Sequence, residues 1–254
     1  MAHTSMTALF EGGNSRLHFA WWDGESVHGV VHVPYPGSDE AFPGMIEDML
    51  GGAIPRAVAA CSVSRRYGGM LFAAMETGFP GTIRIVRSAS DAGVAVRYDS
   101  PETYGIDRAL AALAAYRLVR ASCVVVDAGT AVTVDAVDDD GVVCGGYIFP
   151  GMETLAHGLA ERTRLPMVHA GVLDGELGTS TRLCIERGIA VGIAGAVRAL
   201  IESAAREVKS GDRVIVTGGG GEFLMRLLSL EARWHPHLVL EGLGSVSDSL
   251  SKDT

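Results

Sequence analysis

The sequence predicts an α/β fold that contains two copies of one unit. Runs rich in Val, Ile and Ala, typical of buried strands, alternate with Ala- and Leu-rich stretches of helical character. The chain has 33 glycines, and they gather at the ends of the strand-like runs rather than in a linker. Two segments, "ALFEGGNS" (8–15) and "VVVDAGTA" (124–131), share one plan, with their acids 116 positions apart. A duplication is the economical interpretation, because this spacing is close to half of the 254 residues.

The first expected element is a strand that ends at Glu11. A Gly-Gly turn and a second apolar segment come after it. Further strands are expected at 57–64, 82–86, 123–128, 131–137, 142–149, 213–218 and 237–242. Helices are expected near 40–51, 67–78, 107–121, 151–161, 180–207 and 221–231. The helix at 107–121 would join the two copies, which puts the expected domains at 1–121 and 122–254. Glycines at 188, 192 and 195 would let another helix or subunit approach the helix at 180–207 closely.

The repeated plan of strand, acid and glycine turn suggests a pair of phosphate-binding hairpins. A tight glycine turn exposes backbone N–H groups, and hydroxyl or amide side chains from Asn14, Ser15, Thr130 or Thr133 add further donors. Glu11 and Asp127 cannot bind phosphate directly, but each could hold Mg²⁺, a water of its shell or another cation. A single acid-glycine turn is common in hairpins of every kind, so the argument depends on there being two. A third glycine turn, "VTGGGGEF" (216–223), suits the base or ribose of a nucleotide.

Composition excludes several classes of function. A net charge of −9 argues against a nucleic-acid partner, and no G-x-x-x-x-G-K-[ST] or G-x-G-x-x-G loop follows the first strand. The sequence shows no apolar run of roughly 20 residues and no secretion signal, so we expect a soluble cytoplasmic protein with no membrane partner. The four scattered cysteines are expected to be reduced core thiols. His235 and His237 form the closest approach to a metal cluster, and an exposed loop is the simpler interpretation.

Asp107 allows two interpretations. It begins an Ala-rich helix and is followed at once by Arg108, so it could be an ordinary N-cap. It could also be a general base beside a cation, at a helix end that attracts anions. Thr181 lies in a Ser/Thr cluster that would cap the next long helix, and it could also donate to a ligand.

Six motifs, taken in order, resemble the type III pantothenate kinases, which belong to the acetate kinase, sugar kinase, Hsp70 and actin superfamily. They are "EGGNSR" (11–16), "GIDR" (105–108), "DAGTAVTVD" (127–135), "GGYIFPG" (145–151), "STRLCIERG" (180–188) and "TGG" (217–219). The resemblance spans nearly the whole chain. It implies duplicated ribonuclease H-like (actin-like ATPase) domains, each a mixed sheet flanked by helices, with a cleft between them. It also implies ATP-dependent phosphorylation of pantothenate, the first step of coenzyme A synthesis, by a cytoplasmic homodimer.

The resemblance also implies roles for particular residues. The catalytic base would be Asp107. The first hairpin would bind the ATP phosphates through Glu11, Gly12, Gly13, Asn14, Ser15, Arg16, Leu17 and His18, and Thr130 would bind them from the second. The pantothenate site would be lined by Tyr98, Gly105, Ile106, Asp107, Arg108 and Thr181. The enzyme would need Mg²⁺ with ATP, and Asp127 would hold a monovalent cation, K⁺ or NH₄⁺.

Three positions depart from the family pattern. Glu11 replaces an Asp, Ser180 replaces an Asn, and His18 stands where Lys is frequent. The extra methylene of Glu11 leaves open a non-catalytic alternative, an accessory or regulatory protein that binds pantothenate or nucleotide. A phosphatase, or a sugar or acyl kinase of the same fold, is a weaker alternative, because the second hairpin reads "DAGTAVT" rather than a run of glycines.

Overall fold

The computed structural model describes residues 5–169, 177–229 and 231–248, and the chain divides into two compact units. The first unit comprises Met1–Arg117 and His237–Thr254, and the second comprises Leu118–Pro236. The sequence led us to expect domains at 1–121 and 122–254, which placed the C-terminal segment in the second domain; the structure differs there. That segment belongs to the first unit, where its helix α7 (Leu238–Ser247) packs on the sheet.

The first unit is built on a mixed sheet of five strands in the order β3-β2-β1-β4-β5. The strands are β1 (Thr7–Gly12), β2 (Arg16–Trp22), β3 (Val27–Pro34), β4 (Ala57–Ser62) and β5 (Ile83–Ile85). Central strand β1 pairs antiparallel with β2 and parallel with β4. Because β1 is central and covered on both faces, its residues from Thr7 to Phe10 are all buried and show no polar alternation.

The second unit repeats this arrangement. Its strands are β6 (Cys123–Ala128), β7 (Ala131–Val137), β8 (Val143–Pro150), β9 (Val214–Thr217) and β10 (Arg233–Trp234), in the order β10-β9-β6-β7-β8. In both sheets the third, second, first, fourth and fifth strands of the unit therefore lie side by side. Strands β1 and β6 start 116 residues apart and have the same pattern of burial along their length. The predicted α/β fold with duplicated mixed sheets is confirmed.

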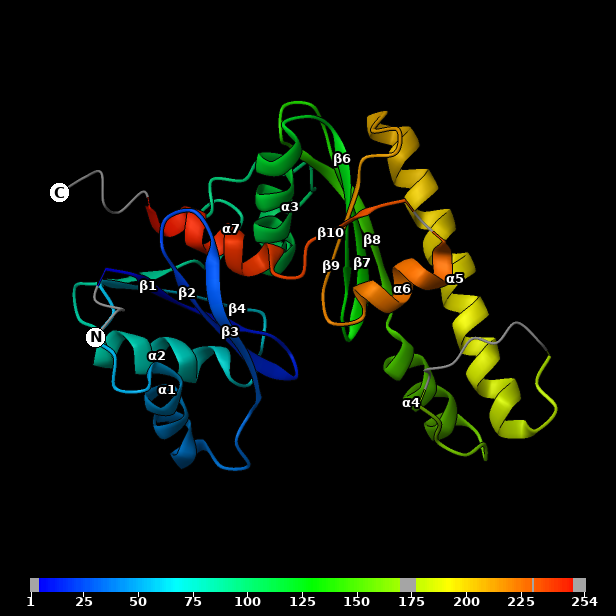
Figure 1. Cartoon of the computed structure of the whole chain (residues 1–254), viewed down its shortest axis with the longest axis horizontal. Helices are drawn as coiled ribbons and strands as arrows, with labels where there is room; N and C mark the ends of the chain where they lie inside the picture. The colour runs from blue at the N-terminus through cyan, green and yellow to red at the C-terminus, as the bar shows by residue number, and fades with distance from the viewer. Residues whose placement is uncertain (1–4, 170–176, 230, 249–254) are drawn as a thin grey trace. The chain divides into compact units, whose positions relative to one another are not determined.

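Helices cover both faces of the first sheet. α1 (Phe42–Leu50) and α2 (Gly68–Gly78) cover one face, where Phe42 and Leu71 join a core with Phe10 and Phe19. α7 packs on β1 and β4, and it lies beside α3 (Ile106–Val119) (Figure 1). Short 3₁₀ turns at Asp39–Ala41 and Pro101–Thr103 precede α1 and α3.

Close crossings hold α7 in the first unit. A side chain at Gly242 would place its Cβ 2.2 Å from the Leu110 carbonyl oxygen of α3. A side chain at Gly244 would place its Cβ 2.4 Å from the ring of Trp22, whose Nε1 donates a 3.0 Å hydrogen bond to Asp248. Glycine at both positions is therefore what lets the helix approach its neighbours.

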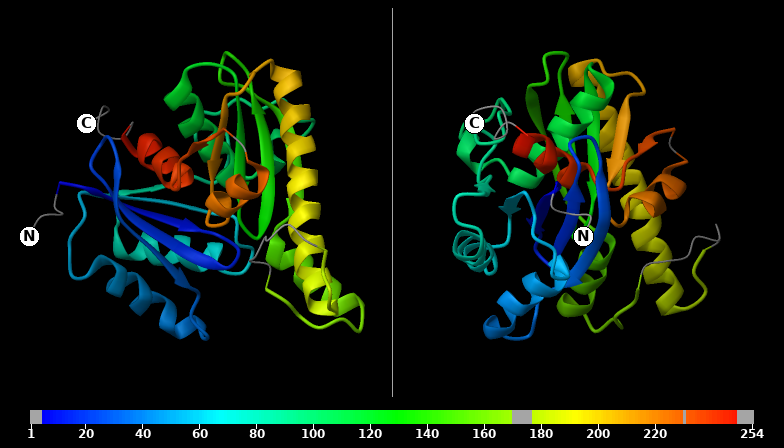
Figure 2. Two further views of the ribbon diagram at one scale, coloured as in Figure 1. Left: turned by 45° about the vertical axis from the view of Figure 1, so that its right-hand side comes forward. Right: turned by 60° about the vertical axis from the view of Figure 1, so that its left-hand side comes forward.

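The helices of the second unit are α4 (Met152–Arg162), α5 (Thr181–Val208) and α6 (Gly221–Leu228). α5 runs along the sheet of β6, β7 and β8 (Figure 2), and Ile193, Val197 and Ile201 lie in the core there. With 28 residues, α5 is long and apolar enough to cross a membrane by length and composition alone. The expectation that no apolar stretch reaches that length is therefore wrong, although one stripe of α5 packs against the sheet as a core helix does.

Other expectations also fail. Residues 237–242 were expected to be a strand, but they begin α7, whose residues Leu238, Leu240 and Leu243 are all buried. A helix buried on every side carries no polar stripe, so its sequence resembles a buried strand. Cys61 and Cys123 are buried as expected, whereas the Cys184 side chain is exposed, so that prediction is wrong there. Strands β3 and β10 were not expected; β3 is a partly exposed edge strand and β10 has two residues.

Candidate active site

The first predicted hairpin joins β1 to β2, and hydrogen bonds to the end of β4 hold its first turn residues in place. Gly13 N–H donates to the Arg16 carbonyl at 3.0 Å, which closes the turn. The Gly12 carbonyl accepts from Ser62 Oγ and from Val63 N–H, both at 2.9 Å, at the end of β4. A Cβ at Gly12 would lie 2.4 Å from Ser62 Oγ, so only glycine fits there. Asn14, Ser15 and Arg16 are exposed at the tip.

Glu11 and His18 face each other across the base of this hairpin. They are register partners in β1 and β2, and His18 Nδ1 lies 3.7 Å from Glu11 Oε2. A second contact joins His18 Nδ1 to His32 Nδ1 at 2.8 Å. Burial, and then the positive charges of His32, Arg16 and His237, lowers the pKa of His18 to about 4. His18 is therefore neutral at pH 7, and its contact with Glu11 is a polar contact rather than an ion pair.

Asp107 is the second residue of α3 and lies in its first turn. Its Oδ1 accepts a 2.8 Å hydrogen bond from the Arg108 N–H. A Cβ at Gly105 would lie 2.6 Å from the same Oδ1, which explains the glycine of the "GIDR" motif. Burial raises the pKa of Asp107, against the lowering effect of the Arg108 N–H and guanidinium. The N-cap interpretation is wrong, because α3 begins at Ile106 and the Gly105 carbonyl accepts the first helical hydrogen bond, from the Ala109 N–H.

Arg108 is held by two tyrosines. Its side chain is buried, its Nη1 donates to Tyr98 Oη at 3.0 Å, and its guanidinium carbon lies 4.5 Å from the centre of the Tyr104 ring. The two rings meet edge to face at 5.0 Å. Sequence reasoning missed Tyr104, although it directly precedes the motif. Stacking of this kind fixes a guanidinium in one orientation.

The two acids of the first unit approach one thiol. Cys61 is paired with Glu11 in the register of β4 and β1. Burial raises the pKa of Cys61, and the negative charges of Glu11 and Asp107 raise it further. Glu11 and Asp107 therefore both lie close enough to Cys61 to affect its pKa.

The second hairpin joins β6 to β7 and is tied down in a similar way. The Thr130 carbonyl accepts from the Gly151 N–H at 3.0 Å and from Thr154 Oγ1 at 2.5 Å. The Ala128 carbonyl accepts from the Gly220 N–H at 2.8 Å. The Thr130 side chain is exposed, as a donor to a ligand must be.

The third glycine turn lies against Asp127. Gly218 has φ +84°, and a Cβ there would lie 2.2 Å from Asp127 Oδ1 and 2.7 Å from the Ala128 carbonyl oxygen. The Ala128 nitrogen would lie 2.8 Å from the same Cβ, so only glycine lets this turn approach the Asp127 carboxylate so closely.

Thr181 lies at the first turn of α5, where Ser180 Oγ accepts a 3.3 Å hydrogen bond from the Leu183 N–H. Ser180 is thus the N-cap that the Ser/Thr cluster predicts. Thr181 also lines an apolar groove of about 520 Å³ between α4, α5 and β8, together with residues that include Leu155, Ile185 and Ile189. Gly188 and Gly192 line the same groove, and a Cβ at either of them or at Gly195 would meet nothing within 4 Å.

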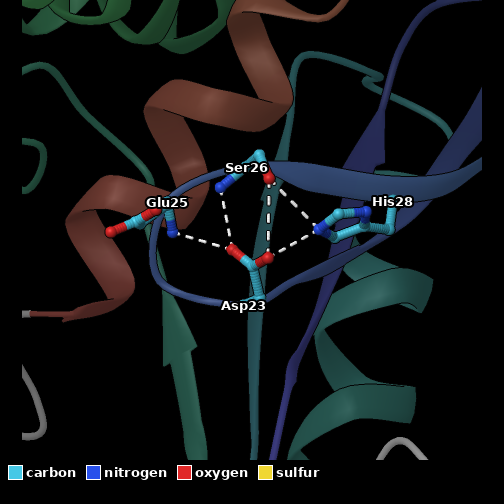
Figure 3. Close-up of polar contacts among 4 residues, drawn as sticks. All are labelled: Asp23, Glu25, Ser26 and His28. Carbon is cyan, nitrogen blue, oxygen red and sulfur yellow. Dashed lines mark hydrogen bonds and ion pairs between the residues drawn. The ribbon is translucent and has the colours of Figure 1, made fainter.

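A Ser-His-Asp cluster elsewhere in the first unit is not a catalytic triad. In the β2–β3 turn, Asp23 Oδ2 lies 2.6 Å from His28 Nε2, and Ser26 Oγ lies 3.1 Å from the same nitrogen (Figure 3). A triad needs the acid and the hydroxyl on opposite ring nitrogens. Asp23 also accepts from the Glu25 and Ser26 N–H groups at 2.8 and 2.9 Å, so the cluster stabilises the turn.

Comparisons with known proteins decide among the alternatives. A family model described as type III pantothenate kinase matches residues 9–203. The type III pantothenate kinase of Halorhodospira halophila is 36% identical over 94% of this chain and 96% of its own. The chain belongs to the type III pantothenate kinase family. The type III pantothenate kinase of Alkalilimnicola ehrlichii is likewise 36% identical, over 94% of this chain and 96% of its own.

Solved structures support the fold of this pantothenate kinase family member. A Baf family transcriptional activator from Campylobacter jejuni superposes with a TM-score of 0.63 at 19% identity, over 96% of this chain and 99% of the other. MreB 5 of Spiroplasma citri, solved with AMPPNP, superposes with a TM-score of 0.55 at 11% identity, over 99% and 98% of the two chains. At these identities the likeness concerns the fold alone, and it confirms the predicted actin-like architecture.

Proposed function

We propose that the chain uses ATP to phosphorylate the primary hydroxyl of pantothenate, the entry step of coenzyme A synthesis, with Asp107 as the general base. The reaction is the one for which the family is named. The observation that carries the role of Asp107 is its position at the N-terminus of α3 with a pKa raised by burial. A carboxylate whose pKa is raised is a stronger proton acceptor at neutral pH than an ordinary aspartate.

In the proposed reaction, Asp107 accepts the hydroxyl proton of pantothenate as that oxygen attacks the γ-phosphorus and ADP departs. Tyr98, Gly105, Ile106 and Thr181 would line the pantothenate site. Arg108 would pair with the carboxylate of pantothenate, because it carries a positive charge directly beside Asp107 and its guanidinium is oriented by Tyr98 and Tyr104.

The phosphates of ATP would lie against the hairpin at 11–18 and against Thr130. Backbone N–H groups at the tip, with Asn14 and Ser15, supply the donors that a triphosphate needs. Among the described residues, no group of three His, Cys, Asp or Glu side chains could hold a metal ion by itself. Mg²⁺ would therefore be bound chiefly through the phosphates, where it neutralises the charge that develops on the transferred group.

Asp127 would hold the monovalent cation, K⁺ or NH₄⁺. The support is the place of Asp127 near the end of β6, at the position that Glu11 has in β1, with its Oδ1 beside the third glycine turn. Asp127 offers oxygen ligands and a single negative charge, which suits a monovalent ion better than a cluster of carboxylates would.

A cytoplasmic homodimer is also part of the proposal. The apolar groove beside α5 and the exposed Val191 on that helix, at 67% exposure, support association through this face. Light scattering tests it: Val191→Asp is expected to lower the mass in solution to that of a monomer, and an unchanged dimer would remove this face from the interface.

The decisive experiment is a coupled assay for ADP release with pantothenate, Mg²⁺ and K⁺. Asp107→Asn is expected to lower kcat by about 100- to 10,000-fold, which is the usual contribution of a general base. Asp99→Asn serves as the matched control, because it removes an exposed acid from the same segment. Full activity of Asp107→Asn would remove Asp107 from the role of base.

The same assay tests Glu11 through Glu11→Asp. The non-catalytic alternative rested on the length of this side chain, and the family assignment gives it no support. Because Glu11 contacts His18 at 3.7 Å, a shorter carboxylate would lose that contact. We expect Glu11→Asp to be less active than the wild type in this chain. Higher activity in the variant would mean that Glu11 impairs catalysis.

A further inference from the structure

In each hairpin, a hydrogen bond from an equivalent position of the duplicated unit holds the carbonyl group of a turn residue; we call this hydrogen bond the tether. In the first unit, Tyr35 directly follows Pro34, the last residue of β3. In the second, Gly151 directly follows Pro150, the last residue of β8. Tyr35 and Gly151 are 116 positions apart, the same spacing as Glu11 and Asp127. They are therefore equivalent positions of the duplicated fold.

Both residues donate a hydrogen bond to the carbonyl of a turn residue, but with different groups. Tyr35 Oη donates to the Gly13 carbonyl at 2.8 Å. Gly151 donates its backbone N–H to the Thr130 carbonyl at 3.0 Å, and a Cβ there would lie 2.3 Å from the Gly129 carbonyl oxygen. In the second unit the chain itself reaches the turn, whereas in the first a phenol spans the gap.

The Tyr35 ring is held in place by other rings. It stacks on Tyr67 with 3.8 Å between centroids and 14° between planes, and Phe42 lies nearly parallel at 6.3 Å. A stacked ring loses little further freedom when its hydroxyl makes a hydrogen bond. The hydroxyl is thus aimed at the turn before any ligand arrives.

The tether fixes one peptide plane. In a trans peptide the C=O of one residue and the N–H of the next point in opposite directions. Holding the Gly13 carbonyl toward Tyr35 therefore turns the Asn14 N–H the other way. The preceding peptide is held as well, because the Gly12 carbonyl accepts from Ser62 and Val63.

We propose that Tyr35 is a positioning residue for nucleotide binding: its hydroxyl sets the Gly13–Asn14 peptide so that the Asn14 N–H faces the phosphates of ATP. This inference rests on the proposed function of the hairpin. Tyr35 does not touch the reacting atoms, so it governs the affinity for ATP rather than the chemical step. The affinity for pantothenate does not depend on it.

Tyr35→Phe tests the proposal, because it removes the hydroxyl and keeps the stacked ring. Tyr67→Phe is the matched control: it makes the same change in the other ring of the stack and leaves the Tyr35–Gly13 hydrogen bond intact. We expect Tyr35→Phe to raise the KM for ATP by about 3- to 10-fold, the effect of losing one hydrogen bond. The KM for pantothenate and the melting temperature should stay close to wild type, and Tyr67→Phe should match wild type in all three.

Two results would overturn the proposal. An unchanged KM for ATP in Tyr35→Phe would show that the hydroxyl is not needed, and an equal rise in both variants would assign the effect to the stack. If the wild type fails to phosphorylate pantothenate, the proposed function fails separately. Calorimetry with a non-hydrolysable ATP analogue then decides: weaker binding in Tyr35→Phe alone supports the tether, whereas equal binding, or none by the wild type, refutes it.

Discussion

Gly218→Ala should disturb the proposed cation site without contacting Asp107, the proposed base. Gly218 has φ +84°, a region that costs an L-residue roughly 1–2 kcal/mol. Its new Cβ would lie 2.2 Å from Asp127 Oδ1 and 2.8 Å from the Ala128 nitrogen. Ordinary contacts need more than 3 Å, so the Asp127 carboxylate must move by about 1 Å. A displacement of about 1 Å can cost on the order of 100-fold in rate.

The assay is ADP release measured across a range of K⁺ concentrations. We expect Gly218→Ala to need more K⁺ for half-maximal activity and to have a lower kcat. Gly158→Ala is the control, because Gly158 lies on α4 outside the proposed site and a Cβ there meets nothing within 4 Å; it should resemble the wild type. If Gly218→Ala folds and keeps the K⁺ dependence of the wild type, the oxygen atoms at Asp127 do not form the cation site.

Three further predictions concern stability. Gly242→Ala should lower the free energy of unfolding by about 1–3 kcal/mol, since its Cβ would lie 2.2 Å from the Leu110 carbonyl oxygen. Gly195→Ala should raise it by up to about 1 kcal/mol, because alanine favours the helix and its Cβ would meet nothing within 4 Å. Thermal melting of the two variants tests both. Folding lowers the pKa of His18 from 6.5 to about 4, so the unfolded chain binds a proton first as the pH drops through this range. The free energy of unfolding should therefore fall between about pH 6.5 and 4, by at most about 3 kcal/mol. In His18→Gln, the free energy of unfolding measured in urea should depend less on pH in that range. Backbone N–H groups of the turn, and then His28, lower the pKa of Asp23, so the stability it gives is present at neutral pH and is lost in acid; the melting temperature of Asp23→Asn should approach that of wild type at low pH.

The duplication was predictable because two short segments of the sequence, which form β1 and β6, share one pattern. Strand β1 and strand β6 each combine a fully buried run with an acid near the end, and both were readable in the sequence. α7 was not, because a helix that is buried on all sides has neither the polar stripe of a surface helix nor the alternation of an exposed strand. Its place in the first unit depends on Gly242 and Gly244, which let α7 approach Leu110 and Trp22. These contacts join residues far apart in the sequence, so the sequence alone does not show why glycine is needed there.

The sequence motifs point to candidate site residues, but not to the contacts that hold them. "GIDR" points to Asp107 and Arg108, and their roles as base and cation stay predictions; the structure adds that Asp107 accepts from the Arg108 N–H and that burial raises its pKa. Tyr104 and Tyr35 lie outside the motifs. Their roles come from stacking and hydrogen bonding across strands and helices, which no local pattern encodes.

The two hairpins differ in a way that explains why their tethers differ. Strands β1 and β6 start 116 residues apart, as do β3 and β8, but β2 and β7 start 115 apart, so the first turn holds one residue more. A longer turn has more freedom to lose on ordering. The second hairpin is shorter and is held by the N–H groups of Gly151 and Gly220 and by the Thr154 hydroxyl. The first is held by the Val63 N–H and by the hydroxyls of Tyr35 and Ser62, so substitutions of these two side chains should alter nucleotide affinity without changing the fold.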